Sequence, residues 1–238
     1  MPLGEIAGVV LLAAVHLFVH RLKWLDVLPR SRWLSFAGGV SVAYVFLHVL
    51  PELAIHEETL AHIAGGDALG GEQIAHALAL AGLVTFYGLE RMVRTLPTHH
   101  AAGYRLHLAS FGIYNVLVGT LVFQREAEGG FSLILFVVAL GLHFVTVDYG
   151  LRQEHKLRFD HVGRWLLAGA ALAGGAIGWA IEVPGWVISV LFAFLAGSVL
   201  LNVLKEELPA ERQSRFVPFL VGTLAYSVLL IVMRWAAG

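Results

Sequence analysis

Eight long apolar stretches, separated by short polar or Gly/Pro-rich breaks, constrain the fold of this 238-residue chain more than any other feature. A helix needs about 20 mostly apolar residues to cross the hydrocarbon core of a bilayer, and each stretch approaches that length. Only 14% of the residues are charged, whereas soluble domains are roughly a quarter charged. The sequence therefore predicts an all-α integral membrane protein with a single polytopic domain over residues 1–238. The predicted spans cover residues 4–20, 33–55, 73–95, 105–124, 131–150, 164–181, 185–207 and 216–235.

The basic residues divide the predicted loops into two classes. All of the 16 Lys and Arg residues except Arg125 and Arg234 lie in or beside the first, third, fifth and seventh loops. Because Lys and Arg concentrate on the cytoplasmic side of a membrane, this separation favours eight spans with both termini outside the cytoplasm. No basic residue precedes the first span, so we expect it to be retained, unlike a signal peptide. The predicted location is a cell membrane, either an inner or a plasma membrane.

Composition also excludes several classes of protein. The net charge of −1 lacks the basic footprint of a nucleic-acid-binding protein. The chain has no cysteine, so disulfides and thiolate metal sites are excluded. The sequence from His56 to Leu60 lacks the second histidine of a metalloprotease helix, and we expect no enzyme activity and no prosthetic group. The lipid bilayer is the one partner that composition itself requires.

Polar side chains within the spans are the candidate functional residues, because ionisable groups at this depth usually face the bundle interior or a water-filled cavity. In the fourth predicted span, His107, Ser110 and Tyr114 recur on one helical face. The other polar candidates within or beside the spans are His16, His20, Tyr44, His48, Glu52, Asn115, His143, Thr146, Asp148, Tyr149, Ser198, Asn202 and Glu206. Imidazole and carboxylate groups suit Zn²⁺, Fe²⁺ or Mn²⁺, and the same groups suit a proton relay. Hydrogen bonding between helices is the structural alternative for each of them.

An acidic, histidine-bearing segment runs from Glu52 to His76 and contains no Lys or Arg. The predicted topology places it outside the cytoplasm. Such a rim would raise the local concentration of cations by electrostatic attraction. A plain solvated loop that obeys the charge rule is the alternative interpretation.

Four segments resemble the ZIP (Zrt/Irt-like) family of metal transporters. The segment Phe46–Glu52 (FLHVLPE) resembles the family signature at the end of the second span. The segments 195–200 and 205–209 are similar to its seventh span. Tyr114–Gly119 and Leu142–Val147 fall where the family has its metal-binding motifs, in the fourth and fifth spans. The resemblance implies an eight-helix bundle in which inverted three-helix repeats surround spans 4 and 5.

The resemblance also implies a metal site, but this chain departs from the family pattern there. Asn115 and His143 match family ligands, whereas Tyr114, Val118 and Val147 replace others. Two ligands are fewer than the three or four of typical zinc sites. We therefore expect Asn115 and His143 as core contacts. The implied auxiliary groups at the core are Tyr114, His107 and Asp148. The implied groups at the outer entrance are His48 and Glu52.

The function implied by the resemblance is transport of a divalent metal cation, of the zinc, iron or manganese type, into the cytoplasm. Two alternatives stay open: a degenerate relative that does not transport and acts as a sensor, regulator or partner, and a histidine-based conductor of protons or solutes. A homodimer is an open alternative for the assembly. The family's helix-breaking prolines are replaced by Leu117 and Thr146, so spans 4 and 5 should be straighter here than in the family.

Overall fold

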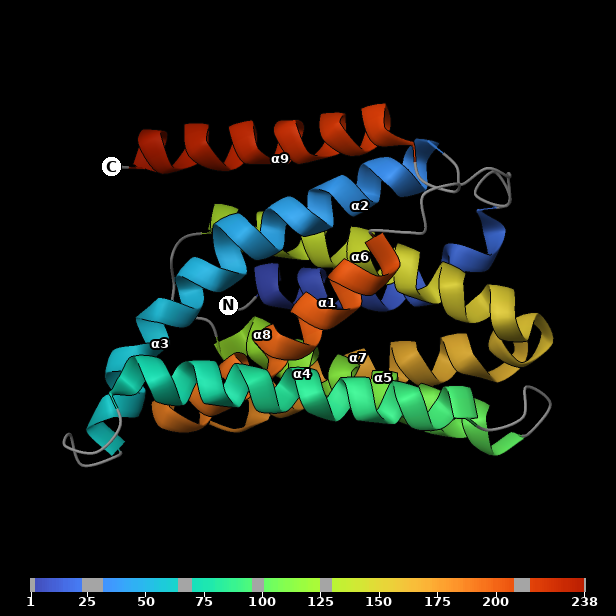
Figure 1. Cartoon of the computed structure of the whole chain (residues 1–238), viewed down its shortest axis with the longest axis horizontal. Coiled ribbons are helices and arrows are strands. Elements are labelled where there is room, and N and C mark those ends of the chain that lie inside the picture. The colour runs from blue at the N-terminus through green and yellow to red at the C-terminus, as the bar shows by residue number, and fades with distance from the viewer. Residues whose placement is uncertain are drawn as a thin grey trace.

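The computed structural model describes residues 3–22, 32–63, 70–95, 101–124, 130–207 and 215–237, and within them it contains helices and no strand (Figure 1). The all-α prediction is therefore confirmed. The elements in chain order are α1 (Leu3–Phe18), η1 (Val19–Arg21), α2 (Arg32–Tyr44), η3 (Val45–Val49), α3 (Leu50–Ile63), α4 (Gly71–Thr95), α5 (Ala101–Gln124), α6 (Gly130–Arg158), η4 (Phe159–Gly163), α7 (Arg164–Ala180), α8 (Gly185–Glu207) and α9 (Phe216–Ala237).

Several of these helices are built to cross a bilayer. Judged by length and composition, five segments of the described chain are long and apolar enough, and a shorter apolar helix covers Phe216–Val232. The longest of the five, Leu133–Ala180, covers most of α6 and all of α7. The five segments are Leu3–Arg21, Arg32–His62, Gly103–Gln124, Leu133–Ala180 and Gly185–Lys205. The chain is thus an α-helical membrane protein by its apolar helices.

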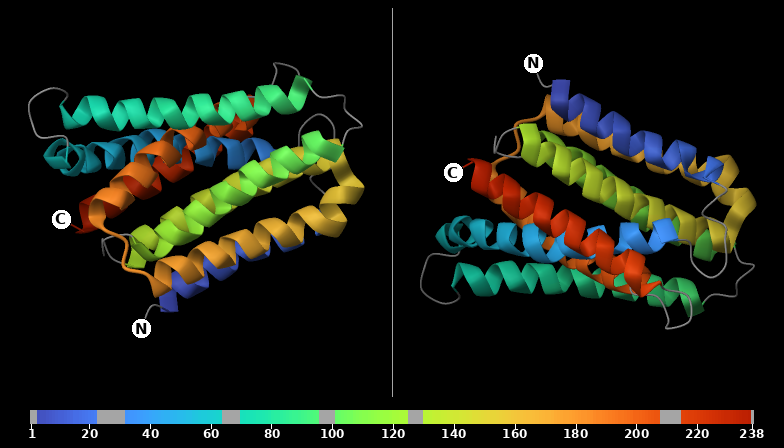
Figure 2. Two further views of the ribbon diagram at one scale, coloured as in Figure 1. Left: turned by 90° about the horizontal axis from the view of Figure 1, so that it is seen from below. Right: turned by 90° about the horizontal axis from the view of Figure 1, so that it is seen from above.

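The helices pack as two groups that lie side by side (Figure 2). The α6 half consists of α1, α5, α6 and α7, with its closest helix contacts between α5 and α7 and between α1 and both α6 and α7. The α8 half consists of α2, α3, α4, α8 and α9, with its closest contacts between α2 and α9 and between α4 and α8. The two halves meet mainly where α2 touches α6 and α4 touches α5.

The two ends of the bundle differ in charge. The acidic end lies where α3 finishes and α4 begins, and it holds Glu57, Glu58 and Glu72. The basic end lies where α6 finishes and α7 begins, and it holds Arg152 and Arg164.

Small residues allow the helices to approach closely in both halves. A Cβ atom on Gly174 would overlap the carbonyl oxygen of Val116, and one on Gly197 would overlap that of Ala79. Thr120 Oγ1 also donates a hydrogen bond of 3.1 Å to the carbonyl oxygen of Gly174. Within a bilayer, such close backbone contact supplies the packing energy that hydrophobic burial supplies in water.

Two helices extend beyond the ends predicted for their spans. The second span was predicted to end near residue 55, but α3 continues to Ile63. The fifth was predicted to end near residue 150, but α6 continues to Arg158, with a kink at His155 (φ −140°, ψ 49°). Both extensions are polar, yet neither contains Pro or Gly within the last turns, and Glu, Lys, Arg and Leu are good helix formers.

Proline accounts for the one irregular turn near the acidic cavity described below. The turn Val45–Val49 is π-helical and immediately precedes the Leu50–Pro51 pair. A proline ring clashes with the carbonyl group four residues earlier, and widening the preceding turn relieves that clash. In contrast, α5 runs unbroken from Ala101 to Gln124, as expected for a fourth span without the family's proline.

Candidate functional site

A hydrogen-bonded chain of three polar side chains lies buried in the α6 half. His16 of α1 bonds through Nδ1 to Oδ2 of Asp148 on α6 and through Nε2 to Oδ1 of Asn115 on α5, each at 2.7 Å. All three side chains are at most 2% exposed. Because ionisable groups at this depth are costly, such a chain is a candidate functional site.

The hydrogen-bond pattern determines how many protons the chain holds. Asn115 donates from Nδ2 to the carbonyl oxygen of Phe111 at 2.8 Å, so its Oδ1 faces His16 as an acceptor. His16 must therefore donate from Nε2, and one further proton must lie between His16 Nδ1 and Asp148 Oδ2. The pair is then neutral as a whole, either as imidazolium and carboxylate or as imidazole and carboxylic acid. Neutrality is what makes the pair tolerable among apolar helices.

One atom of this chain is not satisfied. Oδ1 of Asp148 is buried and has no hydrogen-bond partner among the described residues. Buried carboxylate oxygens are nearly always paired, so an orphaned one indicates a place for a proton, a water molecule or a cation.

His143 and Tyr114 lie beside the chain. Both are 1% exposed, and their rings lie 6.4 Å apart, centroid to centroid. Phe144 packs against both of them and against His16, at a centroid distance of 4.7 Å from the His16 ring. Tyr114, predicted as an auxiliary metal contact, is thus part of an aromatic cluster in the core.

His107 lies elsewhere, in a small polar pocket toward the basic end. It stacks on Phe111 at 4.9 Å between ring centroids and shares the pocket with Asn202, Glu90 and Lys205. The structure therefore separates His107 from Asn115 and Asp148, although the three were predicted to contact one metal ion.

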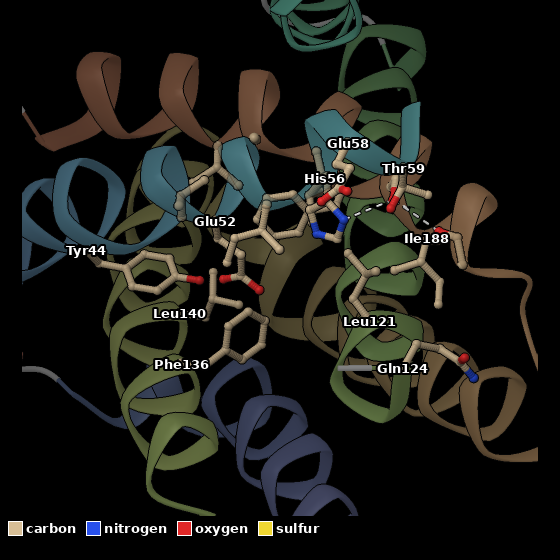
Figure 3. Close-up of a pocket in the computed structure, with 18 residues that line it drawn as sticks. Tyr44, Glu52, His56, Glu58, Thr59, Leu121, Gln124, Phe136, Leu140 and Ile188 are labelled. Atoms are coloured by element: carbon tan, nitrogen blue, oxygen red, sulfur yellow. Dashed lines mark hydrogen bonds between the residues drawn. The ribbon is translucent and has the colours of Figure 1, made fainter. Parts of the chain in front are cut away.

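The predicted entrance residues lie in a third place, at the acidic end. His48 Nε2 lies 3.1 Å from Glu52 Oε2, and the His48 ring stacks on Tyr44 at 5.3 Å. Glu52 and Tyr44 line a cavity of about 320 Å³ between α3, α5, α6 and α8 (Figure 3). In the close-up, the carboxylate of Glu52 and the hydroxyl of Tyr44 point toward one another inside this cavity.

Further acidic and imidazole groups line the same acidic cavity. Glu58, His56 and Thr59 come from the next turns of α3, and no described lining residue is Lys or Arg. Its apolar wall includes Phe136 and Leu140 of α6 and is completed by α8. A cavity of this size and mixed polarity can accommodate a hydrated ion or a small organic molecule.

Ser189 of α8 fixes the orientation of one of these groups. Ser189 Oγ donates to the carbonyl oxygen of Gly185 at 3.1 Å, so it accepts at 3.0 Å from Nδ1–H of His56. In the neutral ring, Nε2 of His56 then carries the lone pair, as in histidines that bind metals.

The described residues do not form a ready-made metal site. No group of three His, Asp or Glu side chains converges in the part of the chain that the structure describes. The oxygen of Asn115, a predicted core ligand, already accepts from His16. A cation at this oxygen would have to use its second lone pair or displace the hydrogen bond from His16.

A charged cluster at the basic end ties α6 to α7. Arg152 donates from Nε to Asp160 Oδ1 at 2.8 Å and from an Nη group to Oδ2 at 3.2 Å. Burial alone would raise the pKa of Asp160. The hydrogen bonds from Arg152, together with the charges of Arg152, His20 and Arg164, outweigh burial and hold that pKa below its ordinary value. We assign this cluster to the stability of the α6–α7 connection.

Sequence reasoning found two members of the buried chain and missed the third. Asn115 and Asp148 were predicted, whereas His16, which joins them, was noted only as a polar residue of the first span. A histidine in an otherwise apolar span was a usable signal, but it named no partner. His56 and Glu58 were likewise assigned to a rim and not to a cavity wall.

Comparisons with known proteins add no family to this description. A scan against protein-family models finds no match, and a search of the curated proteins finds no match either.

Proposed function

We propose that this chain is a multi-pass membrane transporter for a cation, with a divalent metal ion of the zinc, iron or manganese type as its substrate. The proposal includes eight spans, termini outside the cytoplasm, and uptake from the acidic end toward the basic end. It also includes the ZIP-like arrangement of inverted repeats that the four sequence segments suggest. The acidic cavity is the observation that carries it.

Three properties of the cavity support a cation as the substrate. The carboxylates of Glu52 and Glu58 and the imidazole of His56 line it, and none of the described lining residues is Lys or Arg. Acidic walls between apolar helices focus negative potential and raise the local cation concentration. Its volume of about 320 Å³ exceeds that of a bare ion, so the ion would enter with part of its hydration shell.

The buried polar groups deeper in the bundle supply the next contacts of the proposed route. His143 and Asn115 remain the core contacts, with Tyr114, His107 and Asp148 as auxiliary groups and His48 and Glu52 at the entrance. The orphaned Oδ1 of Asp148 would attract a cation once it came within reach. Because Asn115 Oδ1 accepts a hydrogen bond from His16, a cation at the core would share this oxygen with His16 or displace it.

Uptake of metal into liposomes tests the proposal. Purified protein should admit Zn²⁺, Fe²⁺ or Mn²⁺ to an enclosed metal-sensitive dye, and the double variant Glu52→Gln with Glu58→Gln should slow uptake about tenfold or more. The matched control is Glu154→Gln, since Glu154 is exposed at the opposite end of the bundle. An intact protein that moves none of the three ions would refute transport and support a non-transporting relative.

A second candidate function, proton conduction, is favoured by the His16 chain. A single proton lies between His16 Nδ1 and Asp148 Oδ2, and either atom can hold it. Histidine and carboxylate groups in series are a common proton relay in membrane proteins. The same chain could couple a proton to movement of the cation.

A pH-sensitive dye inside the liposomes separates the two candidates. Under proton conduction, an imposed pH gradient decays in the absence of metal, and Asp148→Asn returns the rate to that of protein-free liposomes. The asparagine preserves a hydrogen bond to neutral His16 but cannot exchange a proton. Gradient decay that persists in Asp148→Asn would exclude this chain as the route.

A further inference from the structure

A second polar pocket lies between α4, α5 and α8, toward the basic end. It has a volume of about 10 Å³, which is room for one water molecule. The ammonium of Lys205 and the carboxylate of Glu90 lie 2.8 Å apart in its lining and are 24% and 14% exposed. The pocket therefore contains charged groups and is not sealed inside the bundle.

Asn202 gives this pocket an unsatisfied group. Its side chain is 4% exposed, and Nδ2 has no hydrogen-bond partner among the described residues. A buried amide N–H without an acceptor is destabilising. Asn202 Nδ2 therefore needs a hydrogen-bond acceptor in the pocket. The oxygen atom of a water molecule, either free or in the hydration shell of an ion, would be such an acceptor.

Helix α8 passes along both pockets. Ser189, Ala196 and Val199 line the acidic cavity, and Asn202 and Lys205, on the following turns, line the second pocket. The two pockets thus follow one another along a single helix, from the acidic end toward the basic end.

A buried stretch of α5 separates the two pockets. Leu121 lines the acidic cavity and Phe111 lines the second pocket, and the helix rises about 15 Å between them at 1.5 Å per residue. Tyr114 and Val118 occupy this interval and are 1% and 0% exposed. Phe86 of α4, which lines the second pocket, packs edge-on against Tyr114 at 6.2 Å between centroids.

We infer that the pocket of Glu90, Asn202 and Lys205 is the second water-accessible binding site of one pathway along α8, closed in this conformation at Tyr114 and Val118. Glu90 is the carboxylate that receives the cation there. The Lys205 ammonium holds that carboxylate until a mobile cation displaces it. This inference deepens the proposed transport function and names the basic-end half of its route.

Single cysteines can test the pathway, because the chain has none of its own. A membrane-impermeant thiol reagent attacks the thiolate, which forms in water and not in lipid or a closed core. Ser189→Cys should react only from the acidic-end side of the membrane, and Asn202→Cys and Lys205→Cys only from the basic-end side. Val118→Cys should react from neither side.

Leu204→Cys is the matched control, since Leu204 is adjacent on α8 but faces outward at 38% exposure. It should react about tenfold more slowly than Asn202→Cys, because a lipid-facing thiol stays protonated. If Asn202→Cys and Lys205→Cys react no faster than Leu204→Cys, or react from the acidic-end side, the second site is refuted. Lys205→Cys keeps the test valid if Asn202→Cys fails to fold, because Lys205 is partly exposed.

Lys205→Met, added to Asn202→Cys, tests the role of the ammonium. Removing the ammonium charge should lower the labelling rate several-fold, because a neighbouring cation favours the reactive thiolate, whereas Lys156→Met, at an exposed position on α6, should leave it unchanged. An unchanged rate in Lys205→Met would refute that role. Labelling requires no flux, so the pathway and the transport activity can fail independently of one another.

Discussion

The two halves of the bundle use their polar residues differently. In the α6 half, His16, Asp148 and Asn115 are fully buried and bonded to one another. In the α8 half, the ion pair of Glu90 with Lys205 is partly exposed and borders a pocket.

The two halves thus reduce the cost of a charged group in a bilayer in different ways. A charge in a bilayer is tolerated if it is neutralised by a close partner or if it reaches water. The α6 half uses the first solution, which requires a hydrogen-bond geometry that few conformations satisfy. The α8 half also pairs its charges, since Glu90 and Lys205 lie 2.8 Å apart, but this pair is partly exposed and borders a pocket. We therefore expect substitutions in the α6 half to affect stability most and those in the α8 half to affect access most.

The largest effect should come from Asp148→Leu. It removes one partner of a buried pair and leaves His16 Nδ1 without its bond, which should cost about 3 kcal/mol or more. Asp148→Asn is the control, because its amide can donate to neutral His16. Thermal unfolding in detergent measures both. Equal losses for the two variants would mean that packing volume, and not hydrogen bonding, stabilises this position.

A smaller loss of stability, similar in the two halves, should follow from adding a methyl group at a helix contact. Gly174→Ala in the α6 half and Gly197→Ala in the α8 half would each push a Cβ into a neighbouring carbonyl oxygen, at a cost of about 1–3 kcal/mol. Gly169→Ala on α7 meets nothing within 4 Å and should be neutral or stabilising. The same unfolding assay applies. A tolerated Gly197→Ala would show that the α4–α8 contact is loose, which would sharpen the contrast between the halves.

Glu90→Gln should lower the free energy of unfolding less than Asp148→Leu or the glycine substitutions do, by about 1 kcal/mol or below. The ion pair with Lys205 is partly exposed, and such pairs contribute little to stability. Ser227→Ala, on the half-buried side of α9, serves as a control for a lost minor contact. An unfolding loss as large as that of Asp148→Leu would contradict the proposed difference between the halves.

The smallest effect concerns acid pH at the basic end of the α6 half. The pKa of Asp160 is lowered in the folded protein, so its contribution to stability is present above its unfolded pKa and is lost as pH falls through the folded value. We expect a modest decrease in melting temperature below about pH 4 that Asp160→Asn removes. Melting curves between neutral and acid pH check this, and an unaltered acid response in Asp160→Asn would contradict it.

Much of the fold could be predicted because helices in a bilayer are determined locally. Each helix satisfies its own backbone hydrogen bonds, so hydropathy and polar breaks were enough to indicate an all-α membrane protein. The ends of the helices were less predictable. Residues 56–62 and 151–158 are polar but continue their helices, because hydropathy reports the environment of a segment and not its backbone conformation.

Sequence by itself determined the helical membrane class, the candidate status of Asn115, His143 and Asp148, and the acidic character of the segment that follows Glu52. Tertiary structure decided that His16 pairs with Asp148 across 132 positions, that Tyr114 joins an aromatic core, and that Glu52 and His56 share a cavity. The reason is physical: helix formation depends on neighbours within one or two turns, whereas a buried polar group takes whichever partner the packing of distant helices brings within hydrogen-bond distance.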